Sequence, residues 1–181
     1  METTSHTPGT SGGEAEGPTK VAFRNAMARL AAAVHIVATD GPAGRFGFTA
    51  SAVCSVTDTP PTLLVCVNKA SSSLEALRQN GVLCVNTLSP RQQALSVLFG
   101  GGPAMEDRFR AAEWTPAPSG ASQLDGALIS FDCRVASVAE EGTHRILFCR
   151  VLGITEGSET EALVYFARNY HEIRPAASLA L

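Results

Sequence analysis

The sequence predicts a mainly β, antiparallel domain with a few short helices. Runs of β-branched and apolar residues recur at hairpin spacing and are separated by turns that contain glycine or proline. Residues 128–138 alternate cleanly, with Ile129, Phe131, Cys133 and Val135 on one face. About seven strands with hairpin links form a closed barrel or a sandwich, and the pattern alone leaves both open.

Length indicates one domain, and charge argues against two classes of partner. The chain has 181 residues, and we expect a disordered tail at 1–18, a domain at 19–175 and a second tail at 176–181. A net charge of −3 argues against a nucleic-acid or membrane partner. No apolar run reaches the ~18 residues of a membrane span. Because the N-terminus lacks the regions of a signal peptide, we expect a cytoplasmic protein.

The first elements follow from local patterns. Residues 20–30 carry apolar side chains on one face of a helix, and residues 34–39 are β-branched, as in a strand. The turn Asp40–Gly44 then leads into a second strand that we expect to run unbroken over 45–56.

A buried strand at 62–67 precedes a short helix at 73–80. Ser72 and Glu75 have the spacing of a capping box, and Gly81 ends the helix. Further along we expect a strand at 82–88, a helix from Pro90 to Phe99, a short surface helix or cover loop at 105–109, a loop-rich stretch at 114–125, a strand at 145–154 and a last strand at 163–166.

The stretch from Gly47 to Pro61 is the first candidate site. Thr49, Ser51 and Ser55 share one parity, so in one continuous strand their hydroxyls point to the same face. Hydroxyls can donate to phosphate or ribityl oxygens, and small neighbours let backbone amides approach a flat ring. The alternative is an edge strand whose hydroxyls face solvent.

A serine run follows Asn68 and Lys69 and includes Ser71 and Ser73 at the start of the expected helix. Free backbone N–H groups at a helix start, together with hydroxyls and one ammonium group, suit a phosphate. The alternative is helix capping alone.

Other patterns exclude several functional classes. The glycine run 100–102 lacks the Gly-Lys-Ser/Thr of a P-loop, and no G-x-G-x-x-G of a dinucleotide-binding fold occurs. The five cysteines have no C-x-x-C spacing and lie in expected strands, which predicts small buried side chains, with no structural metal site. A thiol-based redox switch is the alternative for these cysteines.

Three segments, 47–51, 55–56 and 60–65, resemble the flavin-binding signature of the flavin reductase family, which has the FMN-binding split-barrel fold. The likeness extends from about residue 23 to 171 and includes 40–44, 83–89 and Gly142-Thr143-His144. The resemblance therefore implies a split β-barrel and favours it over a sandwich.

The resemblance also implies a function. Members of the family are NADH-dependent FMN reductases, in which hydride passes from nicotinamide to flavin without an acid, base or nucleophile from the protein. Reduced FMN would diffuse to a two-component flavin monooxygenase, here one of pyrimidine (uracil) catabolism, and the protein would be a homodimer. A reductase for an aromatic-compound monooxygenase and a carrier that holds FMN tightly without NADH turnover are the alternatives.

The family's pattern assigns cofactor-binding roles to thirteen positions. They are Phe48, Thr49, Ala50, Ser51, Ser55, Val56, Asn68, Lys69, Ser71, Ser73, Asn86, Phe99 and His144. By this likeness His144 reaches the flavin face and positions the nicotinamide. Thr143 stands where many members carry aspartate, so we expect His144 to act as a neutral hydrogen-bond donor or stacking partner.

Overall fold

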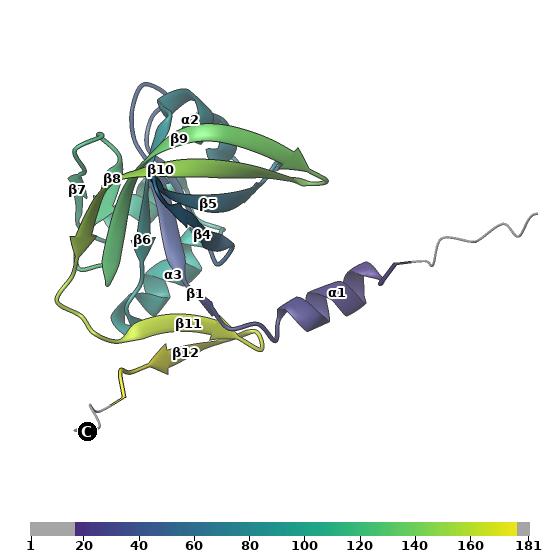
Figure 1. The fold of residues 1–181 in the computed structure, drawn as a ribbon. Helices are drawn as coiled ribbons and strands as arrows, with labels where there is room; N and C mark the ends of the chain where they lie inside the picture. Colours follow the sequence, from purple (N-terminus) through teal and green to yellow (C-terminus); the bar gives the residue numbers. More distant parts are fainter. Residues whose placement is uncertain (1–16, 177–181) are drawn as a thin grey trace, which may run out of the picture.

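A seven-stranded antiparallel sheet forms the body of the molecule (Figure 1). The structure is a computed structural model, and it describes residues 17–176. The strand order is β3-β2-β6-β9-β10-β5-β4. The bounds are β2 His35–Thr39, β3 Phe46–Ala50, β4 Val53–Asp58, β5 Pro61–Asn68, β6 Val82–Thr87, β9 Ile129–Glu141 and β10 His144–Glu156. Most of the two expected tails, 1–16 and 177–181, lies outside the described residues.

The two edge strands of this sheet, β3 and β4, follow each other directly in the sequence. The chain bends at Ser51 and Ala52 to pass from one edge to the other, and Ala52 O accepts a hydrogen bond of 3.0 Å from Cys66 N on β5. The sheet is thus a barrel that is split between its edges. The prediction of one strand over 45–56 was wrong, and the parity argument that placed Ser55 with Thr49 fails with it.

The inside of the barrel is an apolar core. On β5 the burial alternates, so that Leu63, Val65 and Val67 point inward. They pack against Leu83 and Leu147 from β6 and β10. The uninterrupted apolar run at 62–67 predicts this strand, and the structure confirms it, although only alternate side chains are buried.

A second core covers the outer face of β2 and β6. Side chains of α3 Gln93–Phe99, α4 Met105–Arg110, β7 Trp114–Pro116 and β8 Ser122–Leu124 contribute to it, and η1 Pro90–Gln92 leads into α3. Ser89 N donates to Gln92 Oε1 (3.1 Å), which confirms the expected helix start. The stretch 114–125, expected to be loop-rich, contains the small β7–β8 hairpin.

Two helices and a small sheet remain. The sheet has three strands, β1 Ala32–Ala33, β11 Ala162–Phe166 and β12 Asn169–Ile173. The helices are α2 Ser73–Asn80 and α1 Lys20–Met27, and α1 projects away from the body (Figure 1). Gly81 ends α2 with φ of 69°, as expected. The Ser72 side chain, however, makes no capping hydrogen bond with the described residues, so the capping-box prediction was wrong. β12 also follows β11, which had been expected to be the last strand.

The cysteines all lie in strands, as predicted. Cys84, Cys133 and Cys149 are buried, and burial raises the pKa of Cys84 and Cys149 to about 12. These thiols act as small apolar groups in the core. Cys66 is half-buried, but Cys54 is exposed, so the prediction of a buried side chain was wrong for Cys54.

A buried histidine in β2 makes the stability of the fold depend on pH. His35 Nδ1 lies 3.0 Å from Thr87 Oγ1, and burial lowers the pKa of His35 from 6.5 to about 4. Between about pH 6.5 and 4, His35 therefore binds a proton in the unfolded chain but stays neutral in the folded chain. The stabilisation is complete above pH 6.5 and is lost as pH falls toward 4, by about 3 kcal/mol in the free energy of unfolding.

Urea unfolding across this pH range tests the effect. His35→Gln, whose side chain does not titrate, should have a flatter profile than the natural protein. Parallel profiles for the two proteins would show that other groups cause the acid sensitivity.

Candidate functional site

A cleft of about 310 Å³ opens where the barrel is split. One wall is the end of β3 with the following bend, and the other is formed by β5 and the start of β10. The lining residues are Phe48, Thr49, Ala50, Ser51, Ala52, Cys66, Asn68, Ser71, Phe99, Gly100 and His144. Eight of the thirteen sequence-predicted positions are among them.

The β3 wall offers backbone groups to a ligand. Among the described strands, β3 pairs only with β2, so the N–H and C=O groups of its outer edge remain available. The Ser51 hydroxyl has no hydrogen-bond partner among the described residues, and its side chain is exposed. The Thr49 hydroxyl instead donates to Ser96 O (2.6 Å), which fixes β3 against α3.

The opposite wall carries two polar side chains that are cross-strand partners, Asn68 and His144. Asn68 Oδ1 accepts from Ala70 N (2.9 Å), and no described residue accepts a hydrogen bond from its Nδ2. His144 Nδ1 lies 3.0 Å from Thr143 Oγ1. A threonine hydroxyl that donates to Nδ1 keeps the proton on Nε2, so that Nε2–H is a hydrogen-bond donor.

Five predicted positions are not brought into the cleft. Ser55 and Val56 lie on β4, beyond the bend, and both are exposed. Ser73 is buried, and its hydroxyl donates to Gly47 O (3.4 Å). Asn86 is fully buried in the core. Lys69 forms an ion pair with Glu140, and this contact lowers the pKa of Glu140.

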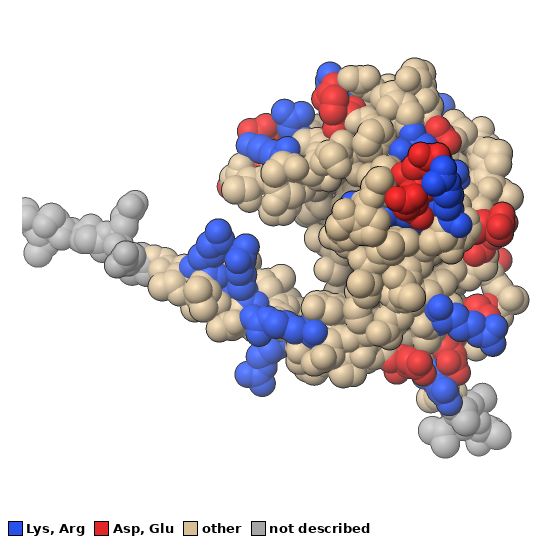
Figure 2. Space-filling model, turned by 180° about the vertical axis from the view of Figure 1, so that it is seen from behind, with Lys and Arg blue, Asp and Glu red and all other residues tan. Residues whose placement is uncertain are grey.

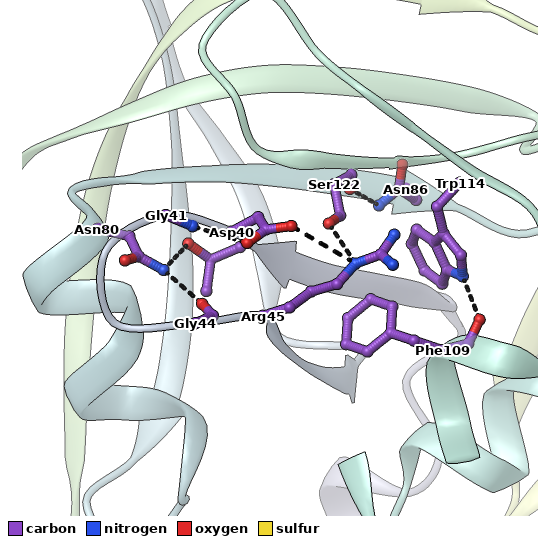
Figure 3. A network of polar contacts seen from close by, with 10 residues as sticks. Asp40, Gly41, Gly44, Arg45, Asn80, Asn86, Phe109, Trp114 and Ser122 are labelled. Atoms are coloured by element: carbon purple, nitrogen blue, oxygen red, sulfur yellow. Dashed lines mark hydrogen bonds and ion pairs between the residues drawn. The ribbon is translucent and has the colours of Figure 1, made fainter. Parts of the chain in front are cut away.

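An aromatic cluster behind the cleft holds Phe99 in place. The ring of Phe99 packs edge-on against Phe109, with centroids 5.1 Å apart, and contacts Trp114. The guanidinium of Arg45 lies 4.3 Å from the centroid of the Phe109 ring (Figure 3). A Cβ atom at Gly47 would lie 2.9 Å from Phe99 Cε1, so only glycine lets β3 approach this ring.

Arg45 itself is fixed by hydrogen bonding and charge. Its Nε donates to Ser122 Oγ (2.8 Å) and lies 3.8 Å from a carboxylate oxygen of Asp40 (Figure 3). Arg45 thus ties the β2–β3 hairpin to the β7–β8 hairpin and stacks on the aromatic cluster. The wall of the cleft that contains Phe99 is therefore rigidly supported.

The whole of this architecture lies within a known family. Residues 27–174 match the family described as "Flavin reductase like domain". The chain belongs to this flavin reductase family. It is 55% identical over 166 residues to "FMN reductase (NADH) RutF" of Ancylobacter novellus, which covers 91% of this chain and 92% of that protein.

Solved structures of flavin reductase relatives agree. A protein from Haemophilus somnus described as a flavin reductase superposes with a TM-score of 0.84 at 47% identity, covering 86% of this chain and 100% of that chain. Nitrilotriacetate monooxygenase component B from Mycobacterium thermoresistibile gives 0.81 at 30% identity, covering 88% and 89%. The split-barrel fold is common to this chain and these relatives.

Three residues that line the cleft, Ala52, Cys66 and Gly100, are not among the thirteen predicted positions. Cys66 lies two residues before Asn68 on β5, so the period of two could have placed both on one face. Gly100 follows α3, and only the packing of that helix against β3 brings it to the cleft.

The residues present in the cleft fit a flavin. Phe48 and Phe99 supply apolar walls, and Ala50 and Ala52 leave room for a flat ring beside the edge of β3. The hydroxyl of Ser51 and the amide of Asn68 are donors that the described protein atoms leave unused. The combination of an apolar slot with a few unpaired donors matches a polar, ring-bearing ligand.

Proposed function

We propose that this chain is an NADH-dependent FMN reductase that supplies reduced FMN to a two-component flavin monooxygenase. The observation that carries this proposal is the cleft between the unpaired edge of β3 and His144, in a chain 55% identical to an FMN reductase (NADH). A relative of the same fold is component B of a monooxygenase, which supports the two-component arrangement.

The chain's contribution to the reaction is binding and orientation. When both are bound, the dihydronicotinamide supplies a hydride and FMN accepts it. The edge of β3 and Ser51 hold the flavin ring, Asn68 and Ser71 bind its polar side arm, and the phenylalanine walls exclude water. Nε2–H of His144 donates a hydrogen bond that orients the nicotinamide.

Steady-state NADH oxidation with FMN, riboflavin, FAD or no flavin tests this function. We expect consumption that depends on added FMN. A folded protein that turns over no NADH with any flavin, or that keeps stoichiometric FMN through gel filtration and transfers no hydride to it, would contradict the proposal.

Replacing His144 with alanine should lower kcat/KM for NADH by about tenfold, the effect of losing one hydrogen bond to a bound ligand. The Kd for FMN should stay the same within a factor of two to three, roughly the scatter of a single contact. Steady-state turnover at varied NADH measures the first quantity, and fluorescence titration with FMN measures the second. Arg145→Ala, one residue along the same strand, is the matched control, and equal NADH kinetics in the two variants would remove His144 from the site.

The monooxygenase served by this reductase is proposed from the resemblance of the sequence. We propose one of pyrimidine (uracil) catabolism, as that resemblance implies. Coupled assays decide between this role and service to an aromatic hydroxylase. We expect uracil ring opening when the reductase is mixed with a pyrimidine monooxygenase component. Added catalase should not abolish product formation.

We also propose a cytoplasmic homodimer. No helix within residues 17–176 is long and apolar enough to cross a bilayer. None of the eight residues of α1 is buried by the described part of the chain, and Phe23 and Met27 are 57% and 47% exposed. So short a helix is marginal without tertiary contacts, which supports a second copy packing on it. Sedimentation should give a dimer, and Phe23→Asp should shift it to the monomer.

A further inference from the structure

The flavin cleft is one end of a longer groove that continues toward α1. A hollow of about 160 Å³ adjoins the cleft through Thr49, Ala50 and Ser51. A larger hollow of about 540 Å³ then shares Ser51 and Tyr165 with it and reaches Arg24 and Arg168. Figure 2 shows the molecule deeply notched here, between the arm that carries α1 and the body. The groove offers more room than the flavin cleft alone.

The far end of this groove is basic. Arg24 and Arg168 line it, and among residues 17–176 no carboxylate lies within 4.0 Å of either guanidinium. α1 contains Lys20 and Arg24 but no acidic residue. Figure 2 shows the basic residues of the arm without acidic ones beside them. In a chain of net charge −3, this end of the groove is locally positive.

The backbone fixes Arg168 at this position. Ala167 and Arg168 form the two-residue turn between β11 and β12 with φ of 49° and 63°, a conformation that normally selects glycine or asparagine. The turn is held against the arm, because Ala167 N donates to Ala28 O (2.7 Å) and Arg168 Nη2 donates to Asn25 Oδ1 (2.6 Å). A strained turn that persists in this way is typical of a functional position.

We propose that Arg24 and Arg168 bind the phosphate groups of the nicotinamide dinucleotide, and this assignment rests on the proposed function. The proposed mechanism places the side arm of the flavin at Asn68 and Ser71, on the other side of Ser51. The groove toward α1 is then left for the second substrate. The planar guanidinium fork binds phosphate oxygens in pairs, and Tyr165 offers an aromatic wall beside it.

The decisive experiment uses Arg168→Gly and Arg24→Gln in steady-state assays with FMN and with riboflavin, which carries no phosphate. Glycine accepts the φ of residue 168 without strain, so the turn should keep its shape. We expect KM for NADH to rise about tenfold in each variant with either flavin, as for a lost charge-assisted hydrogen bond, at unchanged kcat. Inorganic pyrophosphate should compete with NADH in the natural protein and more weakly in the variants.

Arg29→Gln is the matched control, because Arg29 follows α1 and is exposed but does not line the groove. Its KM for NADH should equal that of the natural protein. An unchanged KM for NADH in both groove variants would overturn the proposal. So would a rise confined to KM for FMN and absent with riboflavin, which would assign the site to the flavin phosphate.

A dimer contact is the other way to overturn the proposal. In one such outcome, both groove variants sediment as monomers, and their NADH kinetics change no more than those of Phe23→Asp. That result would assign the two arginines to subunit packing. Calorimetric titration with inorganic pyrophosphate separates the site from the activity. If pyrophosphate binds to the natural protein and not to Arg168→Gly, the phosphate site is supported even when no NADH is oxidised. The absence of NADH oxidation would refute only the reductase function.

Discussion

Replacing Ser51 with leucine should abolish FMN-dependent NADH oxidation while the barrel stays folded. Ser51 is exposed at the bend between β3 and β4, and it lines all three sections of the groove. A branched apolar side chain there fills the space beside the edge of β3 and removes a hydroxyl donor. We expect kcat/KM for FMN to fall by about 100-fold or more, because a steric block of this kind costs about 3 kcal/mol of binding.

The control for this prediction is the same change four residues further along. Ser55 is exposed on β4 and lies outside the cleft, so the FMN kinetics of Ser55→Leu should match those of the natural protein. Fluorescence titration with FMN and urea unfolding separate loss of binding from loss of structure. Normal FMN affinity in Ser51→Leu would place the flavin elsewhere on the molecule and would remove the basis of the proposed function.

Ser51 and Ser55 also show where sequence reasoning reached its limit for the fold. The strand at 62–67 and the glycine that ends α2 follow from local rules, and both predictions were confirmed. The bend at Ser51 and Ala52 contains no glycine or proline from which it could have been predicted. It is imposed by sheet closure, because β3 and β4 must occupy opposite edges, and that is a tertiary constraint that a parity rule cannot detect.

The residues of the candidate site also fall into two groups, those that the sequence predicts and those that only the structure brings together. Thr49, Ser51 and His144 were found through short motifs that resemble a family signature, and the fold brings all three to one cleft. Arg24 and Arg168 come from opposite ends of the chain and meet only because β11 pairs with β1 next to α1. The sequence 168–171 resembles a closing motif of the family, but no local pattern marks Arg24, so only the structure could place both arginines on one groove.

Replacing Asn86 with leucine should destabilise the protein strongly while sparing FMN binding. Its Oδ1 accepts from Leu124 N (2.9 Å) and Ser130 Oγ (2.9 Å), and its Nδ2 donates to Ile36 O (3.1 Å). Leucine has nearly the same shape but leaves these buried groups without partners. Since each unsatisfied group costs about 1–3 kcal/mol, we expect the free energy of unfolding to fall by about 3 kcal/mol or more.

Asn80→Leu is the matched control, because Asn80 is only half-buried and water can replace its bonds to Thr39 and Gly44. Its loss should be about 1 kcal/mol in the same urea titration. If Asn86→Leu instead kept the urea midpoint and lost FMN affinity, Asn86 would belong to the flavin site, as the family's pattern implies. The buried amide of Asn86 joins β2, β6, β8 and β9 behind the cleft, which favours a role in holding the barrel together over contact with the ligand.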